Sequence, residues 1–153
     1  MASRIPAPPH FLRTERPGFR SWTEDDLGLA LGLWGDPEVT RLIDARGRLS
    51  REHVRLRPHD PPAPIYELGL HIRSLHWRRG FAAEAASAVI RHGFGRLQAA
   101  GLFAGHHPDN HASRRLLTKL GFRYTHDELY PPTGLLHPSY MLMPARGSSD
   151  GAV

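Results

Sequence analysis

Residues 76–122 constrain the fold of this chain more than any other stretch. A turn at Gly80 opens one helix, a short strand follows at residues 102–105, and Asn110 begins a second helix. The first few N–H groups of a helix have no partner inside it, so helix N-termini bind phosphate and other electron-rich groups. The order helix, strand, helix predicts two such N-termini close together, and hence a site for a cofactor that carries a pyrophosphate.

Chain length and composition favour one soluble domain. The chain has 153 residues, of which 40% are hydrophobic and 23% charged. That length can bury one ordinary core. No long apolar run is present, which argues against a membrane span. The first residues lack the apolar segment of about 7–15 residues that marks a signal peptide. The absence of cysteine excludes disulfides, thiolate metal sites and cysteine nucleophiles. We expect a cytoplasmic protein.

The formal net charge is +5 with neutral histidines, and arginines supply most of the positive charge. These arginines are scattered along the chain, and helix-turn-helix, zinc-finger and aromatic RNA-binding signatures are missing. The charge pattern therefore favours a basic site for an anionic small molecule over a nucleic-acid-binding face.

We expect three regions: a flexible Pro-rich arm at residues 1–10, one domain at residues 11–143, and a disordered tail at residues 144–153. In the domain, Thr23 and the three acidic residues after it predict a capped helix start. Gly35-Asp36-Pro37 is expected to end that helix.

The centre of the domain is expected to alternate strands and helices. Residues 66–72 alternate apolar and polar side chains, which predicts a strand with Glu67 in its middle. A helix is predicted from Gly80 to about Gln98, with Gly101 as its left-handed end. The Asn110 helix should close at Gly121. Residues 122–130 and 137–143 read as two more strands around a Pro-Pro-Thr-Gly turn.

Several motifs resemble the GNAT acetyltransferases, particularly the branch that acetylates the N-termini of ribosomal proteins. Residues 77–85 (WRRGFAAEA) are similar to the acyl-CoA loop of that branch, and residues 110–113 (NHAS) with 119–122 (KLGF) are similar to its second hallmark. Residues 22–26 and 33–39 match its opening helix. The resemblance covers most of residues 11–143. It implies an α+β fold with a central mixed sheet flanked by helices, splayed so that acetyl-CoA can insert.

The resemblance implies a set of cofactor-binding residues that the physical chemistry of the loop supports. Gly80 and Ala82 leave backbone N–H groups accessible to a pyrophosphate, and two arginines add positive charge. The alternative is an ordinary exposed basic turn. One departure is Arg78, which stands where the family usually has glycine. The full set is Trp77, Arg78, Arg79, Gly80, Phe81, Ala82, Asn110 and Ser113.

Glu67 is the expected catalytic base, because the resembling enzymes often place a carboxylate there that deprotonates the amine through water. An amine with a pKa of about 10 is mostly protonated at neutral pH and cannot attack a thioester until it loses that proton. The alternative is a solvated strand carboxylate. His71, four residues further and on the same face of the predicted strand, is a second candidate base.

Asn110 has two compatible roles: it can cap the helix, and it can hydrogen-bond the pantetheine arm. By resemblance Ser113 faces the thioester sulfur, where it could steady or protonate the departing thiolate. Relatives outside this branch use a tyrosine four residues later, where this chain has Leu117. A surface helical serine is the alternative for Ser113.

Three histidines near the second helix raise the question of a metal site. His107 and His111 are four residues apart, but Pro108 should break the helix between them. No pattern of carboxylate ligands accompanies these two residues and His106. We therefore expect no bound metal.

The segment before Tyr66 departs from the family. Members of the family normally place two antiparallel strands there, and such a hairpin needs on the order of 12–15 residues. This chain has only residues 55–65 available, and the segment is rich in proline, which opposes strand pairing. We expect the fold to be shortened there by a hairpin. The exposed edge would be covered by a homodimer partner or by a rearranged N-terminal segment.

The resemblance implies acetyl transfer from acetyl-CoA to a primary amine, either a protein N-terminus or a small molecule, by direct attack. The alternative is a non-catalytic acyl-CoA-binding protein derived from the same fold.

Overall fold

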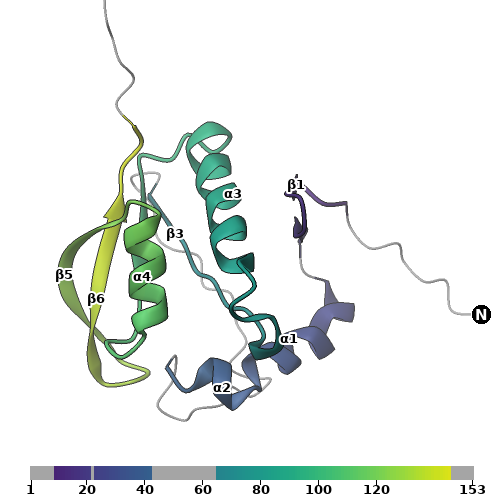
Figure 1. The fold of residues 1–153 in the computed structure, drawn as a ribbon, viewed down its shortest axis with the longest axis horizontal. Coiled ribbons are helices and arrows are strands. Elements are labelled where there is room, and N and C mark those ends of the chain that lie inside the picture. Colours follow the sequence, from purple (N-terminus) through teal and green to yellow (C-terminus); the bar gives the residue numbers. More distant parts are fainter. Residues whose placement is uncertain (1–8, 22, 43–64, 146–153) are drawn as a thin grey trace, which may run out of the picture.

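The computed structural model describes residues 9–21, 23–42 and 65–145, and its centre is a four-stranded mixed sheet. The strand order is β3-β4-β6-β5, in which β3 and β4 are parallel and the other neighbours antiparallel. Helices α3 and α4 flank this sheet (Figure 1). The strands are β3 (Ile65–Glu67), β4 (Gly101–Gly105), β5 (Arg123–Tyr130) and β6 (Leu135–Leu142), and the two helices are α3 (Phe81–Gly95) and α4 (His111–Lys119). The expected α+β fold with a mixed sheet is confirmed.

The core lies where α3 and α4 pack on β4 and β6. Helix α3 approaches β4 closely at Gly93, where an added Cβ would lie 3.3 Å from Leu102 Cδ2. A larger residue at Gly93 would require the Leu102 side chain to shift by a few tenths of an ångström. The buried core residues are Ala99, Leu102, Ala104, Leu117, Phe122 and Tyr140.

Strand β3 is shorter than the predicted strand at residues 66–72. Pairing with β4 ends where Leu68 N–H donates to Phe103 O (2.8 Å), and residues beyond it leave the sheet. Glu67 therefore lies at the C-terminal end of β3 and not in mid-strand. The alternation in the sequence was real, because Leu68 packs on the core, but separation from β4 removes the hydrogen-bonding partner.

Helix α3 also ends earlier than predicted, at Gly95. Gly101 is wrong as its left-handed end, because it is the first residue of β4 and Gln98 has the positive φ of 51° instead. The Gln98 side-chain amide donates to Gly95 O (2.7 Å) and so satisfies a carbonyl at the helix end. Turning at Gln98 then lets Ala99 enter the core.

Helix α4 follows its sequence signals. Asn110 is the N-cap, and Gly121 has a φ of 88°, the left-handed conformation that glycine adopts without strain. The β5–β6 hairpin turns at residues 131–134, also as predicted.

The N-terminal region forms a small hairpin and a short helical segment. Thr23 N–H donates to Asp26 Oδ2 (2.9 Å), so the predicted capped start is right, although the first turn is 3₁₀. Two guanidinium hydrogen bonds from Arg20 hold the pKa of Asp26 well below its usual range. The elements are β1 (Leu12–Arg13), β2 (Gly18–Phe19), η1 (Glu24–Asp26), α1 (Leu27–Trp34) and α2 (Pro37–Thr40), and a 3₁₀ turn η3 (Ser74–His76) precedes α3.

Some expectations fall on residues outside those described. The predicted hairpin loss before Tyr66 concerns residues 55–65, which lie outside the described residues except for Ile65. Residues 1–8 and 146–153 make up most of the predicted arm and tail. Within the described ranges, β3 has a strand neighbour on one side only. None of the helices in those ranges has the length and apolar character needed to cross a bilayer.

Candidate active site

The predicted site residues gather at one edge of the sheet. Because β3 and β4 are parallel, their C-terminal ends lie at the same edge. The loop into α3 follows β3, and the loop into α4 follows β4. Both helix N-termini therefore begin on the side where the two strands separate (Figure 1). This arrangement offers unpaired N–H groups to an anionic ligand.

The loop that opens α3 is turned by two left-handed residues. Arg78 has a φ of 59° and Gly80, the N-cap, a φ of 79°. Before them, Trp77 Nε1–H donates to Ile72 O (2.7 Å) and fixes the chain that leaves β3. A left-handed arginine occupies the position where the resemblance expects glycine, so the backbone has kept the turn and the side chain has changed.

Basic and aromatic side chains surround the start of α3. The Phe81 ring lies under the guanidinium of Arg16 at 4.5 Å and that of Arg79 at 5.4 Å. The His76 ring meets Phe81 edge-on at 5.8 Å. The aromatic ring thus holds two positive charges beside the helix N-terminus.

The N-terminal hairpin reaches this loop through Glu84, a contact that sequence reasoning missed. Thr14 Oγ1–H and Arg16 N–H donate to Glu84 Oε1 (2.6 and 2.9 Å), and Arg16 Nε–H donates to Oε2 (2.6 Å). The hydrogen bonds from Thr14 and then from the Arg16 backbone lower the pKa of Glu84. No local signal announces this contact, because 68–70 residues separate the partners.

Asn110 and Ser113 lie together at the start of α4. Asn110 Oδ1 accepts from Ser113 N–H (3.0 Å), which confirms the capping role. Among the described residues the Asn110 side-chain nitrogen makes no hydrogen bond, so it is available to a ligand. Ser113 is half-buried, and Leu117 one turn later is buried in the core. Leu117 therefore has a packing role at the position where some relatives have tyrosine.

Glu67 is exposed and pairs in register with Phe103, the last residue of β4 that bonds to the β3 segment. Its carboxylate is thus at the point where the strands part. Glu67 and Ser113 make no hydrogen bond to each other in the described part of the chain.

His71 lies further along the departing segment. Its Nδ1 accepts from Trp34 Nε1–H (2.9 Å), and the rings meet edge-on. Part of the side chain reaches solvent, yet the groups packed around the ring desolvate it and lower its pKa. A pocket of about 290 Å³ adjoins His71 and lies between the departing segment, β2 and α3. Its lining is mostly apolar: Pro17, Phe19, Leu70, His71, Ile72, His76, Phe81 and Ala85.

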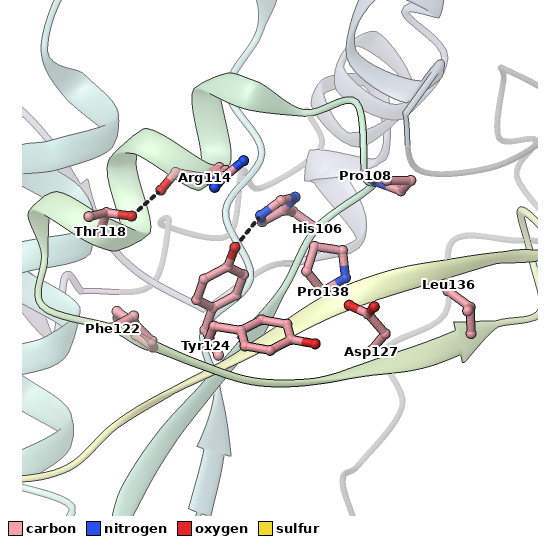
Figure 2. A pocket seen from close by; sticks show the side chains of 10 residues that line it. His106, Pro108, Arg114, Thr118, Phe122, Tyr124, Asp127, Leu136 and Pro138 are labelled. Carbon is pink, nitrogen blue, oxygen red and sulfur yellow. Dashed lines mark hydrogen bonds between the residues drawn. The ribbon is translucent and has the colours of Figure 1, made fainter.

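A larger pocket of about 440 Å³ lies between α4 and the β5–β6 hairpin (Figure 2). None of the predicted cofactor-binding or catalytic residues lines it, so its size does not make it the donor site. On its wall His106 Nδ1–H donates to His107 O (2.7 Å), which leaves Nε2 to accept from the Tyr140 hydroxyl (3.3 Å). Burial lowers the pKa of His106.

Two of the three histidines that could have suggested a metal site, His106 and His107, form other hydrogen bonds. His107 Nδ1 accepts from Asp109 N–H (3.1 Å), and residues 106–110 are not helical, as Pro108 predicted. In the described ranges no group of three or more His, Asp or Glu side chains is arranged to hold a metal ion.

Comparison with known proteins supports the fold and a partial family match. Residues 51–123 match the family model of the acetyltransferase (GNAT) domain. The chain superposes on a GNAT-family acetyltransferase from Bacillus anthracis with a TM-score of 0.74 and 19% identity, covering 86% of this chain and 97% of that one. An acetyltransferase from Agrobacterium tumefaciens gives a TM-score of 0.67 at 22% identity, over 94% and 98% of the two chains. The chain therefore has the GNAT fold, and its residues 51–123 are similar to the GNAT acetyltransferase domain.

Individual relatives match shorter parts. The uncharacterised N-acetyltransferase YoaA of Bacillus subtilis is 46% identical over 57 residues, which cover 37% of this chain and 32% of YoaA. The uncharacterised N-acetyltransferase p20 of Bacillus licheniformis is 25% identical over 145 residues, covering 73% and 82%. Mycobacterium smegmatis RimJ in complex with CoA-disulfide has a TM-score of 0.51 at 20% identity, over 56% of this chain and 43% of RimJ. The chain thus matches about a third of YoaA's length.

Proposed function

We propose that this protein transfers an acetyl group from acetyl-CoA to a primary amine by direct attack. The observation that carries the proposal is the left-handed turn at Arg78 and Gly80, which opens α3 at the sheet edge where β3 and β4 separate. Such a turn directs N–H groups at an anion, and the separated strands leave room for the pantetheine arm.

The donor half of the site would be the two helix starts. The N–H groups after Gly80 bind the pyrophosphate, and Arg78 and Arg79 add charge. The Asn110 Nδ2–H group donates a hydrogen bond to the pantetheine arm, while Asn110 Oδ1 caps α4. The side chains that complete the site are Trp77, Phe81, Ala82 and Ser113.

The chemistry follows from the placement of Glu67. Glu67, through a water molecule, takes a proton from the ammonium group and frees the amine to attack the thioester carbonyl. A C–N bond forms and the C–S bond breaks, while backbone N–H groups of the separated strand stabilise the oxyanion. The departing thiolate receives its proton from Ser113 or from solvent.

Glu67 is a better base than His71 in this arrangement. Since Nδ1 of His71 accepts from the Trp34 indole, a neutral His71 ring carries its proton on Nε2. The lone pair of Nδ1 is therefore occupied by the Trp34 hydrogen bond, and uptake of a proton at Nδ1 would break that bond. The carboxylate of Glu67 has no such constraint.

The acceptor is proposed to be a protein N-terminus or a small-molecule amine. The resemblance of residues 77–85 to the ribosomal-protein branch favours an N-terminal amine, and RimJ is a structural neighbour with bound CoA-disulfide. A homodimer partner or a rearranged N-terminal segment is proposed to cover the edge of β3 that has no strand neighbour among the described residues.

Acetyl-CoA should raise the melting temperature of the purified protein by mass action, and release of CoA thiol should follow on adding an amine from a panel of peptides, polyamines and aminoglycosides. Glu67→Gln should lower kcat by roughly 100-fold or more and leave the thermal shift intact. Glu128→Gln, an exposed carboxylate on β5, is the matched control. A shift without turnover on any amine would favour the acyl-CoA-binding alternative, and no shift at millimolar acetyl-CoA would reject the proposal.

A further inference from the structure

We propose that Arg16, in the N-terminal hairpin, is a positioning residue for the pyrophosphate of acetyl-CoA. It neutralises Glu84 and fixes the Arg79–Gly80 peptide so that the Gly80 N–H faces the cofactor. The inference rests on the proposed function, because it assumes that the start of α3 binds the donor.

Glu84 poses a problem for an anion site at this place. It lies in the first turn of α3, three residues after Phe81. A carboxylate there benefits from the helix dipole, but it competes with a pyrophosphate for the same positive potential. An anion site at this helix start therefore needs the charge of Glu84 to be compensated.

Arg16 supplies that compensation. Its Nε and Nη2 both lie 2.6 Å from Glu84 Oε2, while Thr14 and the Arg16 backbone occupy Oε1. Both carboxylate oxygens are thus engaged on the hairpin side. The charge of Glu84 is paired, and the carboxylate is held in place by donors from one short segment.

The remaining Arg16 nitrogen acts on the loop backbone. Arg16 Nη1–H donates to Arg79 O (2.7 Å). In a trans peptide the C=O and the following N–H point in opposite directions, and no peptide bond of the described chain is cis. Holding Arg79 C=O toward Arg16 therefore turns the Gly80 N–H away from the hairpin.

The guanidinium also defines the space around Gly80. A Cβ at Gly80 would lie 3.3 Å from Arg16 Nη2, and the Arg16 guanidinium covers the Phe81 ring at 4.5 Å. One side chain thus contacts the carboxylate, the carbonyl and the ring that frame the loop. An exposed ion pair alone would contribute little, so the carbonyl contact is the part that matters for positioning.

The test compares two donors in four proteins: wild type, Arg16→Gln, Glu84→Gln and the double variant. Acetyl-CoA carries the pyrophosphate and acetyl-pantetheine lacks it. Arg16→Gln should raise KM for acetyl-CoA roughly tenfold with kcat within about twofold of wild type, and change KM for acetyl-pantetheine less than twofold. The double variant removes the unpaired charge of Glu84 but still lacks the contact to Arg79 O, so its KM for acetyl-CoA should recover only in part and stay at least about threefold above wild type.

Two further variants separate positioning from folding. Arg13→Gln removes another hairpin arginine, whose guanidinium bonds His10 and not the loop, and it should leave both KM values unchanged. Arg16→Lys keeps the charge but not the fork, and should give an intermediate KM for acetyl-CoA.

Equal KM values for wild type and Arg16→Gln, or equal losses with both donors, would overturn the positioning role while the proposed function stands. If wild type neither binds acetyl-CoA nor turns it over, the proposed function fails and the positioning role fails with it.

Discussion

At the scale of single residues, Arg78 is the most unusual backbone position of the candidate site. A non-glycine residue with a φ of 59° places its Cβ against the following carbonyl, which costs about 1–2 kcal/mol. Strain of this kind concentrates at ligand-binding turns. Gly80 in the sequence predicts a turn. A second left-handed residue at position 78 was not predicted, because arginine rarely adopts that conformation.

Arg78→Gly should stabilise the folded protein by up to about 1 kcal/mol. It removes the left-handed strain, and the greater entropy of glycine in the unfolded chain offsets roughly 0.5–1 kcal/mol of that gain. The free energy of unfolding in urea measures the change. Arg79→Gly is the matched control, because Arg79 has no positive φ and its replacement should destabilise by about 0.5–1 kcal/mol. A destabilised Arg78→Gly protein would mean that the arginine side chain makes up for its own strain.

At the scale of elements, α4 combines a structural and a ligand-binding role in one residue. Asn110 Oδ1 caps the helix, and its nitrogen is proposed to bind pantetheine. The two roles use different atoms, so substitutions can separate them.

Asn110→Asp should keep the cap and lose the amide donor, whereas Asn110→Ala should lose both. We expect Asn110→Ala to cost about 1 kcal/mol of unfolding free energy and Asn110→Asp to cost little. Both should raise KM for acetyl-CoA by a similar factor. Chemical denaturation and steady-state kinetics on the same preparations measure the two effects. A normal KM for Asn110→Asp would contradict the pantetheine contact.

The elements that the sequence predicted well are those defined by local signals. The Asn110 cap, the Gly121 terminator and the Pro-rich turn between β5 and β6 each act within a few residues. The elements that it predicted poorly end at particular contacts of the folded chain and not at sequence signals. Strand β3 stops where β4 moves away, and α3 ends where the Gln98 side chain reaches back to Gly95. Neither event leaves a mark in the local pattern.

The same division holds for the candidate site. Residues 77–82, Asn110 and Ser113 are the predicted set, and the structure brings each motif to a helix start at one sheet edge. The Thr14 and Arg16 contacts with Glu84 could not be predicted, because hydrogen bonds across 68–70 residues follow only from the packed fold.

At the scale of the whole molecule, stability should depend on pH through histidines buried between β4 and the β5–β6 hairpin. Burial lowers the pKa of His106 and of His137, and the positive charge of Arg114 acts in the same direction on His106. Because these pKa values are lower in the folded state, the unfolded chain binds more protons than the folded chain once the pH falls below about 6.5. Stability should therefore be complete above that pH and decline as pH falls toward the folded-state values.

Denaturation curves from pH 8 to pH 5 check this expectation. His106→Asn and His137→Asn should each lower the free energy of unfolding at pH 8 by removing a packed ring, yet flatten its decline at acid pH. Each variant at pH 8 serves as its own reference, since imidazoles are then neutral in the folded and unfolded chains. An unchanged slope in both variants would assign the acid sensitivity to other groups.

The hydrogen bonds from Thr14 and Arg16 to Glu84 also bear on the order of folding. During synthesis the hairpin leaves the ribosome long before α3 exists, and its partner carboxylate lies 68–70 residues away. Closing so long a loop is entropically slow and is rewarded only after the helix has formed. The β1–β2 hairpin should therefore join last, and an intermediate with its sheet and helices assembled would still lack the Arg16 contact that holds the turn before α3.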